Sequence, residues 1–171
     1  MSFTHRPADA PHVAIPWLPR LWGAARAGVR ALAWGQPAAL LAARWYVGGV
    51  FFRSGLTKLR DWDTTLALFQ DEYQVPWLDP VVAAWAGTAG ELVLPVLLVA
   101  GLGARLSALG LTVVNIVAVL SLPELSDAAW QGHLWWGSLL LAVVLWGPGA
   151  WSVDHPLARW IDRRLGRSAQ R

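Results

Sequence analysis

The sequence predicts an all-α protein: a four-helix transmembrane bundle with an N-terminal interfacial amphipathic helix and a short interfacial helix between spans one and two. Two observations predict this class. Hydrophobic residues make up 56% of the 171-residue chain and charged residues only 15%, against about 25% in an ordinary soluble domain. The chain also holds 13 Trp, many at the edges of apolar runs, and Trp favours the lipid headgroup level.

Four apolar stretches predict the spans, because a helix of about 20 apolar residues crosses a bilayer. We expect them at 38–59, 79–102, 103–122 and 130–147. Span two opens with Asp79 and Pro80, and proline is tolerated in the first turn of a helix. Pro123 closes span three. The two shorter spans can be accommodated by tilt or by local thinning of the bilayer.

Two amphipathic segments predict interfacial helices. Residues 17–34 carry apolar side chains on one helical face and arginines on the other, which is typical of a helix lying in an anionic leaflet; a helix packed on the soluble side of the protein is the alternative. Residues 62–73 place four apolar side chains on one face, after Asp61 or Asp63 as a helix cap. These four are Trp62, Leu66, Phe69 and Tyr73.

These segments divide the chain into three parts. Residues 1–36 hold a tail and the first interfacial helix, 37–158 form the membrane domain, and 159–171 form a basic tail. Residues 1–16 carry prolines without periodicity and predict a mobile tail. Asp154 and His155 come before Pro156 and are interpreted as a helix cap rather than as chemistry.

The charges predict the orientation. Arginines concentrate in the two ends of the chain and in the short link at Arg105, while the loop between spans three and four holds Glu124 and Asp127 and no base. Positively charged loops stay in the cytoplasm, so both termini are expected inside, which requires an even number of spans. Since these bases flank spans, the pI of about 10.2 does not indicate nucleic-acid binding.

A buried polar centre is expected at Arg44 and Glu91. Glu91 is the only charged residue between Asp79 and Leu102, and a carboxylate at that depth needs a partner. Counting 1.5 Å per residue from the outer ends of spans one and two puts Arg44 and Glu91 at similar depth. We therefore predict an Arg44–Glu91 ion pair, which could either serve chemistry or only lock the helix register.

Other polar residues form a candidate pocket rim. Arg53, Lys58, Asn115 and His133 could surround a pocket open to the outside, with Glu91 at its floor. Each also has a simpler interpretation: Lys58 as a snorkelling lysine, His133 as an interfacial residue, Asn115 as a bond across helices.

Gly48 and Gly55 share a narrow helical arc with Arg44 and Lys58. Glycines on such a stripe let a neighbouring helix approach closely. We therefore expect span one to pack against another span along this arc.

No intrinsic cofactor or metal site is expected. The chain has no cysteine, which excludes disulfides, thiolate metal sites, iron–sulfur clusters and a cysteine nucleophile. Only His133 lies near a span, whereas a bis-His haem needs two intramembrane histidines. No serine or metal constellation indicates a soluble enzyme, and the catalytic residues stay unknown.

Four segments resemble the DoxX family of small bacterial membrane proteins over residues 38 to 158. They read RWYVGGVFFRSGLTKL, WDTTLALFQDEYQVPWL, ELVLPVLLVAGLGARLSALGL and GPGAWSVDH. The residues that fit the family pattern are Arg44, Gly48, Gly55, Lys58 and Glu91. The resemblance implies a multi-pass four-helix bundle in the bacterial plasma (inner) membrane and carries over no catalytic residue. DoxX-like proteins are associated with a terminal quinol oxidase, with thiosulfate:quinone oxidation in distant relatives, or with oxidative and metal stress.

Three functions follow as hypotheses. The first is a membrane component of a quinone-linked oxidoreductase or stress-response system, without a redox centre of its own, taking electrons from a redox partner. The second is a non-catalytic scaffold or accessory protein for a partner. The third is a small proton or solute conduit, for which a homo-oligomer could supply the missing room. Substrate, partner and oligomeric state are left open by the sequence.

Overall fold

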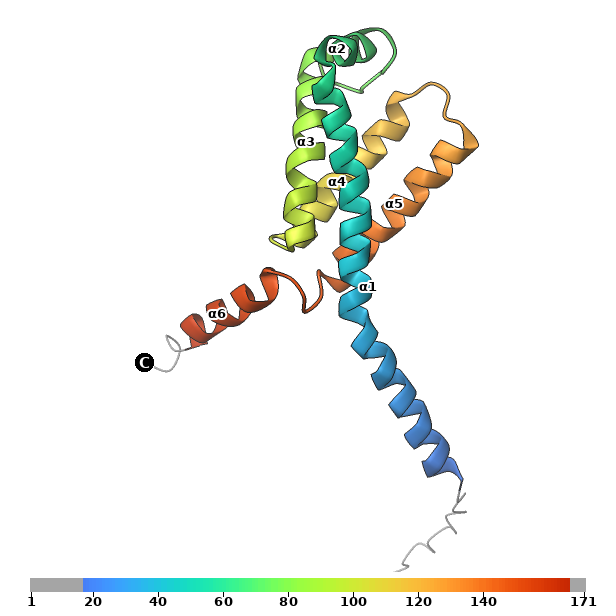
Figure 1. Ribbon diagram of the computed structural model, residues 1–171, viewed down its shortest axis with the longest axis vertical. Coiled ribbons are helices and arrows are strands. Elements are labelled where there is room, and N and C mark those ends of the chain that lie inside the picture. The colour runs from blue at the N-terminus through green and yellow to red at the C-terminus, as the bar shows by residue number, and fades with distance from the viewer. Residues whose placement is uncertain (1–16, 167–171) are drawn as a thin grey trace, which may run out of the picture. The chain divides into compact units, whose positions relative to one another are not determined.

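The computed structural model describes residues 17–166, which form six helices and no strand (Figure 1). The helices are α1 (Leu18–Arg60), α2 (Trp62–Asp71), α3 (Pro80–Ala100), α4 (Ala104–Ser121), α5 (Asp127–Trp146) and α6 (Asp154–Gly166). The expected all-α class is confirmed. The predicted mobile tail at 1–16 lies outside the described residues, as do residues 167–171 of the predicted basic tail.

The chain divides by its contacts into two units, Met1–Gly35 and Gln36–Arg171. The sequence predicted one helix ending near residue 34 and a new span opening after Pro37, and this is wrong: α1 is continuous and contains Pro37. Proline removes a single backbone hydrogen bond, so helical residues on both sides can carry a helix through it. Within the first unit every described residue is exposed, and its position at a membrane surface stays a prediction.

Side-chain caps set the starts of α3 and α5. The Asp79 carboxylate accepts hydrogen bonds from the backbone N–H of Val81 at 2.9 Å and of Val82 at 3.3 Å, so α3 begins where the sequence predicted. The Ser126 hydroxyl accepts from the Ala129 N–H at 3.3 Å. Because this cap comes before the apolar run, α5 begins at Asp127, earlier than the predicted residue 130.

α2 packs its apolar face on α3. Asp61 caps α2 by accepting from both the backbone N–H and the hydroxyl of Thr64, and these two hydrogen bonds hold the pKa of Asp61 below its usual value. The predicted shared face is confirmed: Phe69 is buried in a small apolar cluster with Ala83 and Ala84 of α3. The partly buried side chains of Trp62, Leu66, Tyr73 and Val75 pack against this cluster.

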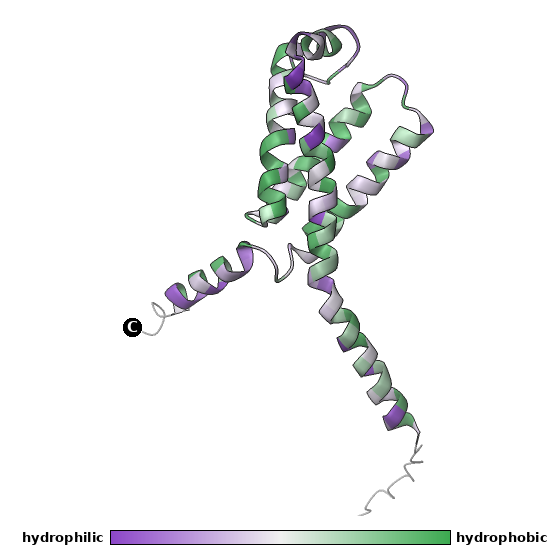
Figure 2. Ribbon diagram, in the orientation of Figure 1, coloured by the Kyte–Doolittle hydropathy of each residue, from purple (hydrophilic) through white to green (hydrophobic). Residues whose placement is uncertain are grey.

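The second half of α1 shares one apolar core with α3, α4 and α5. Its buried members are Val47 and Phe51 from α1, Leu98 from α3, Ala104, Ala108 and Leu111 from α4, and Leu140 and Val143 from α5. Among the described helices, α3, α4 and α5 are long and apolar enough to cross a membrane (Figure 2). The second half of α1 carries four basic residues, and its role as a fourth span stays a prediction.

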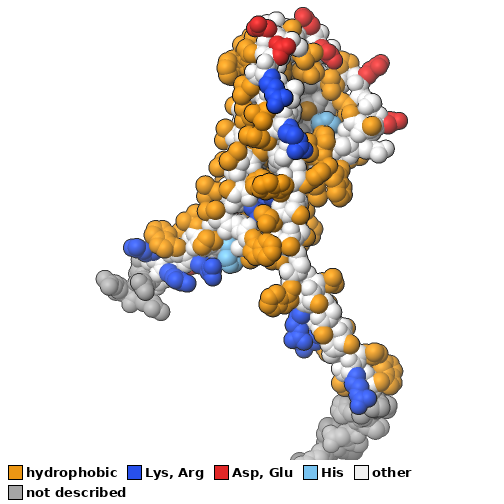
Figure 3. Space-filling model, viewed as in Figure 1, with side chains coloured by type: hydrophobic (Ala, Val, Ile, Leu, Met, Phe, Trp, Pro, Cys, Tyr) orange, Lys and Arg blue, Asp and Glu red, His pale blue; other side chains and the backbone are white. Residues whose placement is uncertain are grey.

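The helical core has an α2 end and an α6 end. The α2 end comprises residues 60–79 and 121–127, which are joined by a hydrogen bond from the Gln74 N–H to the Ser121 carbonyl at 2.8 Å. The α6 end comprises the 101–103 turn and residues 147–154, which are joined by a hydrogen bond from the Asp154 N–H to the Gly101 carbonyl at 2.8 Å. On the face in Figure 3, acidic side chains gather at the α2 end and basic ones lie along α6.

Candidate functional site

Glu91 pairs with Lys58, and the predicted Arg44–Glu91 ion pair is wrong. Lys58 Nζ lies 2.6 Å from Glu91 Oε2, and the same ammonium donates to Ser54 Oγ at 3.0 Å. Glu91 is buried and Lys58 is half-buried, so the carboxylate is held mainly by this one cation. The expectation that a carboxylate on α3 needs a basic partner was met by a different base.

The ion pair was predicted wrongly because depth was counted at about 1.5 Å per residue from the outer end of each span. That count assumes that the last turn of α1 and the first turn of α3 lie at the same height. A Cβ built on Gly55 would lie 3.1 Å from Glu91 Cβ, so Glu91 is level with the last turns of α1. Arg44 is three turns further along α1 at about 3.6 residues per turn, beyond reach of the carboxylate.

Arg44 instead binds backbone carbonyls at the α6 end. Nη1 donates to the Leu98 carbonyl at 3.2 Å and to the Val99 carbonyl at 2.9 Å, and Nη2 donates to the Trp151 carbonyl at 2.5 Å. The side chain is fully buried, with 0% of its surface exposed. Because α3 ends at Ala100, its last carbonyls run out of helical N–H partners, and Arg44 supplies a donor to Val99 and a second donor to Leu98, whose carbonyl also accepts from the Gly101 N–H. Its role is to fasten α1 to the end of α3 and to the segment after α5.

Asp154 fastens the same end from the other side. Its carboxylate accepts from the Gly103 N–H at 2.8 Å through Oδ1 and from the Ala104 N–H at 2.9 Å through Oδ2. The sequence predicted a cap for the helix that follows, whereas the structure makes Asp154 the first residue of α6 and uses its carboxylate to cap the start of α4. Gly103 offers no side-chain cap, so the distant carboxylate supplies it.

Gly101 should not tolerate a side chain, and Gly103 provides the matched control. Both have positive φ, 72° and 57°, so alanine costs about 1–2 kcal/mol at either. A Cβ at Gly101 would lie 2.6 Å from Arg44 Nη1 and 2.5 Å from Ser152 Cβ, whereas nothing lies within 4 Å at Gly103. We expect Gly101→Ala to lower the unfolding free energy by a further 1–3 kcal/mol or so, measured by Trp-detected thermal unfolding. Equal effects at both glycines would contradict the packing described here.

Gly48 and Gly55 lie where α3 comes closest to α1. A Cβ built at Gly48 would be 2.8 Å from Val99 Cγ2, and one at Gly55 would be 2.9 Å from Leu92 Cγ. Such distances are below normal van der Waals contact, so neither position has room for a side chain unless a neighbour moves. Because α1 approaches α3 closely at both glycines, Arg44 and Lys58, which lie on the same stripe of α1, can both reach α3.

A cavity of about 450 Å³ lies beside the Lys58–Glu91 pair. Its lining is mainly apolar and comes from α1, α2, α3, α4 and α5 and from the segment after α2. The polar groups that line it include Ser54, Lys58, Glu91, Tyr73 and His133. The sequence analysis did not predict Ser54 as a site residue, although Ser54 lies one turn before Lys58 and the two side chains therefore share one helical face.

His133 is oriented by Asn115. The Asn115 amide donates from Nδ2 to the His133 carbonyl at 3.0 Å, which turns its Oδ1 toward His133 Nδ1, 2.8 Å away. This places Nδ1 to donate to Asn115 Oδ1, and in the neutral form of the ring Nε2 is then the acceptor. The ring also meets Trp136 edge-on, with centroids 5.0 Å apart. Asn115 thus acts behind the cavity wall, while His133 lines the cavity.

The remaining candidates divide between the cavity and the surface. Lys58 and His133 line the cavity with Glu91, whereas Arg53 is exposed and is not among the lining residues. Tyr73, which the sequence placed only on the face of α2, covers the cavity from the α2 end. Its burial, together with the charges of Glu72 and Glu91, raises the pKa of Tyr73, so the phenol stays protonated and able to donate.

Metal ligands are not gathered anywhere in residues 17–166: no group of three or more His, Cys, Asp or Glu side chains there could hold an ion. The cavity chemistry in the described chain therefore consists of an ion pair, the hydroxyls of Ser54 and Ser121, a phenol and an imidazole in an apolar shell.

Comparison with known proteins supports a family assignment. An uncharacterized protein of Haemophilus influenzae is 31% identical over 142 residues, which are 74% of this chain and 92% of that protein. The DoxX family model matches residues 39–123. The chain belongs to the DoxX family. It is a DoxX-family membrane protein, and the matched range contains Arg44, Lys58, Glu91 and Asn115. No solved structure matches the chain.

The DoxX match covers only part of the candidate site. It ends at residue 123, before His133 of α5 and before the segment that supplies the Trp151 carbonyl to Arg44. The ion pair and the asparagine thus lie in the part that this chain shares with the DoxX model, while His133 and α6 lie outside it.

Proposed function

We propose that this DoxX-family protein is a membrane component of a quinone-linked oxidoreductase, and that its cavity binds the head of a quinone. The observation that carries the proposal is an apolar cavity of about 450 Å³ with a buried ion pair in its wall. Ligand pockets are mostly apolar, with a few polar groups that fix orientation, and measure roughly 300–1,000 Å³. A quinone, with an apolar tail and a ring carrying two carbonyl oxygens, suits such a site.

The polar groups match the needs of that ring. Lys58 Nζ has three N–H donors, of which Ser54 and Glu91 use two, so one can meet a quinone oxygen. The Tyr73 hydroxyl is a second donor on the cavity wall. Rings of Phe51, Phe69 and Trp136 give the ring apolar contacts. A bound quinone would supply the capacity to take up two electrons and two protons, and the electrons would come from a redox partner.

Proton exchange is the second task of these residues. Glu91, Lys58 and His133 are groups that can hold or release a proton, and all three line one cavity. His133 is already oriented with Nδ1 toward Asn115, which leaves Nε2 to accept. In this proposal Lys58 and Glu91 orient the ring, and His133 exchanges protons with it.

The test is cross-linking of the full-length protein in nanodiscs with an azido-quinone, competed with decylubiquinone. We expect saturable labelling that maps to cavity-lining peptides. Competition should be about tenfold weaker after Glu91→Gln, because Lys58 then loses the carboxylate that holds its ammonium in place for the ring. Ala118→Phe, which fills the cavity, should abolish labelling. Leu120→Phe on the same helix is the control, because Leu120 is 61% exposed and does not line the cavity. Unsaturable labelling, or equal labelling of both phenylalanine variants, would refute the proposal.

We also propose four spans in a bacterial inner membrane, with both termini cytoplasmic. Support comes from the shared core, in which the second half of α1 packs with the three apolar helices. The distribution of charge supports the orientation, since Arg105 and the arginines of α6 lie next to the α6 end in the chain, whereas Glu124 and Asp127 lie at the α2 end. The scaffold and conduit hypotheses and the homo-oligomer stay predictions.

A further inference from the structure

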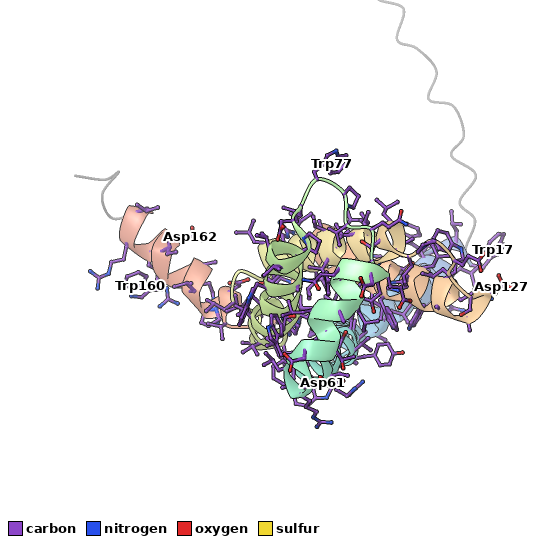
Figure 4. The ribbon with its side chains drawn as sticks, turned by 90° about the horizontal axis from the view of Figure 1, so that it is seen from above. Trp17, Asp61, Trp77, Asp127, Trp160 and Asp162 are labelled. Atoms are coloured by element: carbon purple, nitrogen blue, oxygen red, sulfur yellow. The ribbon has the colours of Figure 1, made fainter. Side chains whose placement is uncertain are left out.

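α6 presents an apolar face that nothing in the described chain covers. None of its residues is buried. Leu157, Trp160, Ile161 and Leu165 recur at helical spacing and are 40%, 55%, 40% and 65% exposed. The opposite face carries Arg159, Asp162 and Arg163, and Figure 4 shows Trp160 and Asp162 on different sides of the helix. The sequence analysis predicted a basic tail at residues 159–171 and did not predict α6.

The first turn of α6 is tied to the turn between α3 and α4. The Val153 N–H donates to the Ala100 carbonyl at 3.2 Å, and the Asp154 N–H donates to the Gly101 carbonyl at 2.8 Å. The Asp154 carboxylate caps α4 in return. Since α3 and α4 are both long and apolar enough to cross a membrane, their connecting turn marks a membrane boundary. α6 therefore starts at the level of the lipid headgroups.

The charges of α6 indicate which surface it meets. Arg159 and Arg163 stand on the polar face, and the Arg164 guanidinium lies over the Trp160 ring, 5.1 Å from its centroid. An arginine next to an interfacial tryptophan can extend to phosphate level while its stem stays among apolar groups. Helices with an aromatic and aliphatic face and an arginine-bearing face lie in the plane of anionic membranes.

We propose that α6 is a lipid-binding helix that lies in the headgroup layer of an anionic leaflet. Leu157, Trp160, Ile161 and Leu165 enter the boundary of the acyl chains, and Arg159 and Arg163 bind lipid phosphates. The helix begins at the segment whose Trp151 carbonyl binds Arg44. Contact of α6 with the leaflet therefore holds the fastened α6 end of the helical core at the membrane surface. This inference does not depend on quinone binding.

Site-directed spin labelling of the full chain tests the proposal, because the natural sequence contains no cysteine. Ile161→Cys reports the apolar face and Asp162→Cys, its neighbour, reports the polar face. Each labelled protein is placed in nanodiscs of phosphatidylcholine with phosphatidylglycerol, and the accessibility of the label to oxygen and to a water-soluble nickel chelate is measured. We expect the label at 161 to be reached by oxygen and shielded from nickel, and the label at 162 to show the opposite.

A second set of samples tests whether α6 needs anionic lipid and its arginines to lie at the membrane. In nanodiscs of phosphatidylcholine alone, and after Arg159→Gln with Arg163→Gln in anionic nanodiscs, the label at 161 should lose much of its protection from nickel. Equal exposure of both labels to nickel would mean that α6 lies in water and would overturn the proposal. A label at 161 that is immobilised and shielded from both reagents would mean a protein partner or a second copy instead. Unchanged protection without anionic lipid would overturn the charge assignment.

Discussion

Arg44→Met is expected to lower the free energy of unfolding by about 3–5 kcal/mol, the largest effect of any single change proposed for this chain. Arg44 is fully buried and donates to the carbonyls of Leu98, Val99 and Trp151. Leu98 keeps a second donor, the Gly101 N–H at 3.1 Å, but no other donor to the remaining two carbonyls is found among the described residues. The Val99 and Trp151 hydrogen bonds are part-buried, so each unpaired carbonyl costs at most the roughly 1–3 kcal/mol of a fully buried one, and the rest of the expected loss comes from removing the buried guanidinium itself.

The measurement is unfolding of the purified protein in mixed micelles, followed by intrinsic Trp fluorescence. Arg53→Met is the matched control, since Arg53 lies on the same helix, is exposed and should change stability by no more than about 0.5 kcal/mol. Arg44→Lys should fall between the two, because an ammonium lacks the planar fork that reaches several carbonyls at once. If Arg44→Met and Arg53→Met have the same small effect, then the carbonyls do not depend on Arg44.

The second large effect is expected at the Lys58–Glu91 pair. Lys58→Met should lower the unfolding free energy by roughly 2–4 kcal/mol, because it leaves a buried carboxylate without its cation. Glu91→Leu should cost less, since the lysine is 20% exposed, still meets Ser54, and has a long stem that can turn its ammonium toward water. The double variant should recover most of the loss, because two apolar side chains can replace a buried pair at little net cost.

A double-mutant cycle in the same micelles measures this coupling, and we expect an interaction energy of about 1–3 kcal/mol. Additive losses would mean that the two side chains do not stabilise each other. The cycle also separates structure from ligand binding. The double variant should fold nearly as well as the natural protein and yet fail to bind decylubiquinone, which a purely structural ion pair does not predict.

The partners of Glu91 and Arg44 show how far the sequence could lead. A lone carboxylate in an apolar stretch had to be paired, and Arg44 had to find acceptors, because the charge of neither can be buried cheaply alone. The partner of each residue depends on the axial offset between α1 and α3. The close approach of the two helices at Gly48 and Gly55 fixes this offset, which cannot be obtained by counting residues from the helix ends.

α6 and the cavity show a different kind of limit. The spacing of Leu157, Trp160, Ile161 and Leu165 was present in the sequence and would have predicted an amphipathic helix. The cavity could not have been found this way, because its lining comes from five helices and a connecting segment. Ser54 and Tyr73 become part of a polar site only when α1 and the segment after α2 face the same space.

The sequence by itself determined the all-α class, the bounds of α3 and α4, the face on which α2 packs, and the need for a basic partner at Glu91. These follow from hydropathy and from the 3.6-residue period, which are properties of neighbouring residues. Tertiary structure alone decided that Lys58, 33 residues away, meets Glu91, and that Arg44 binds a carbonyl 107 residues away. Such pairings depend on how several helices pack together, which cannot be predicted from any short stretch of sequence.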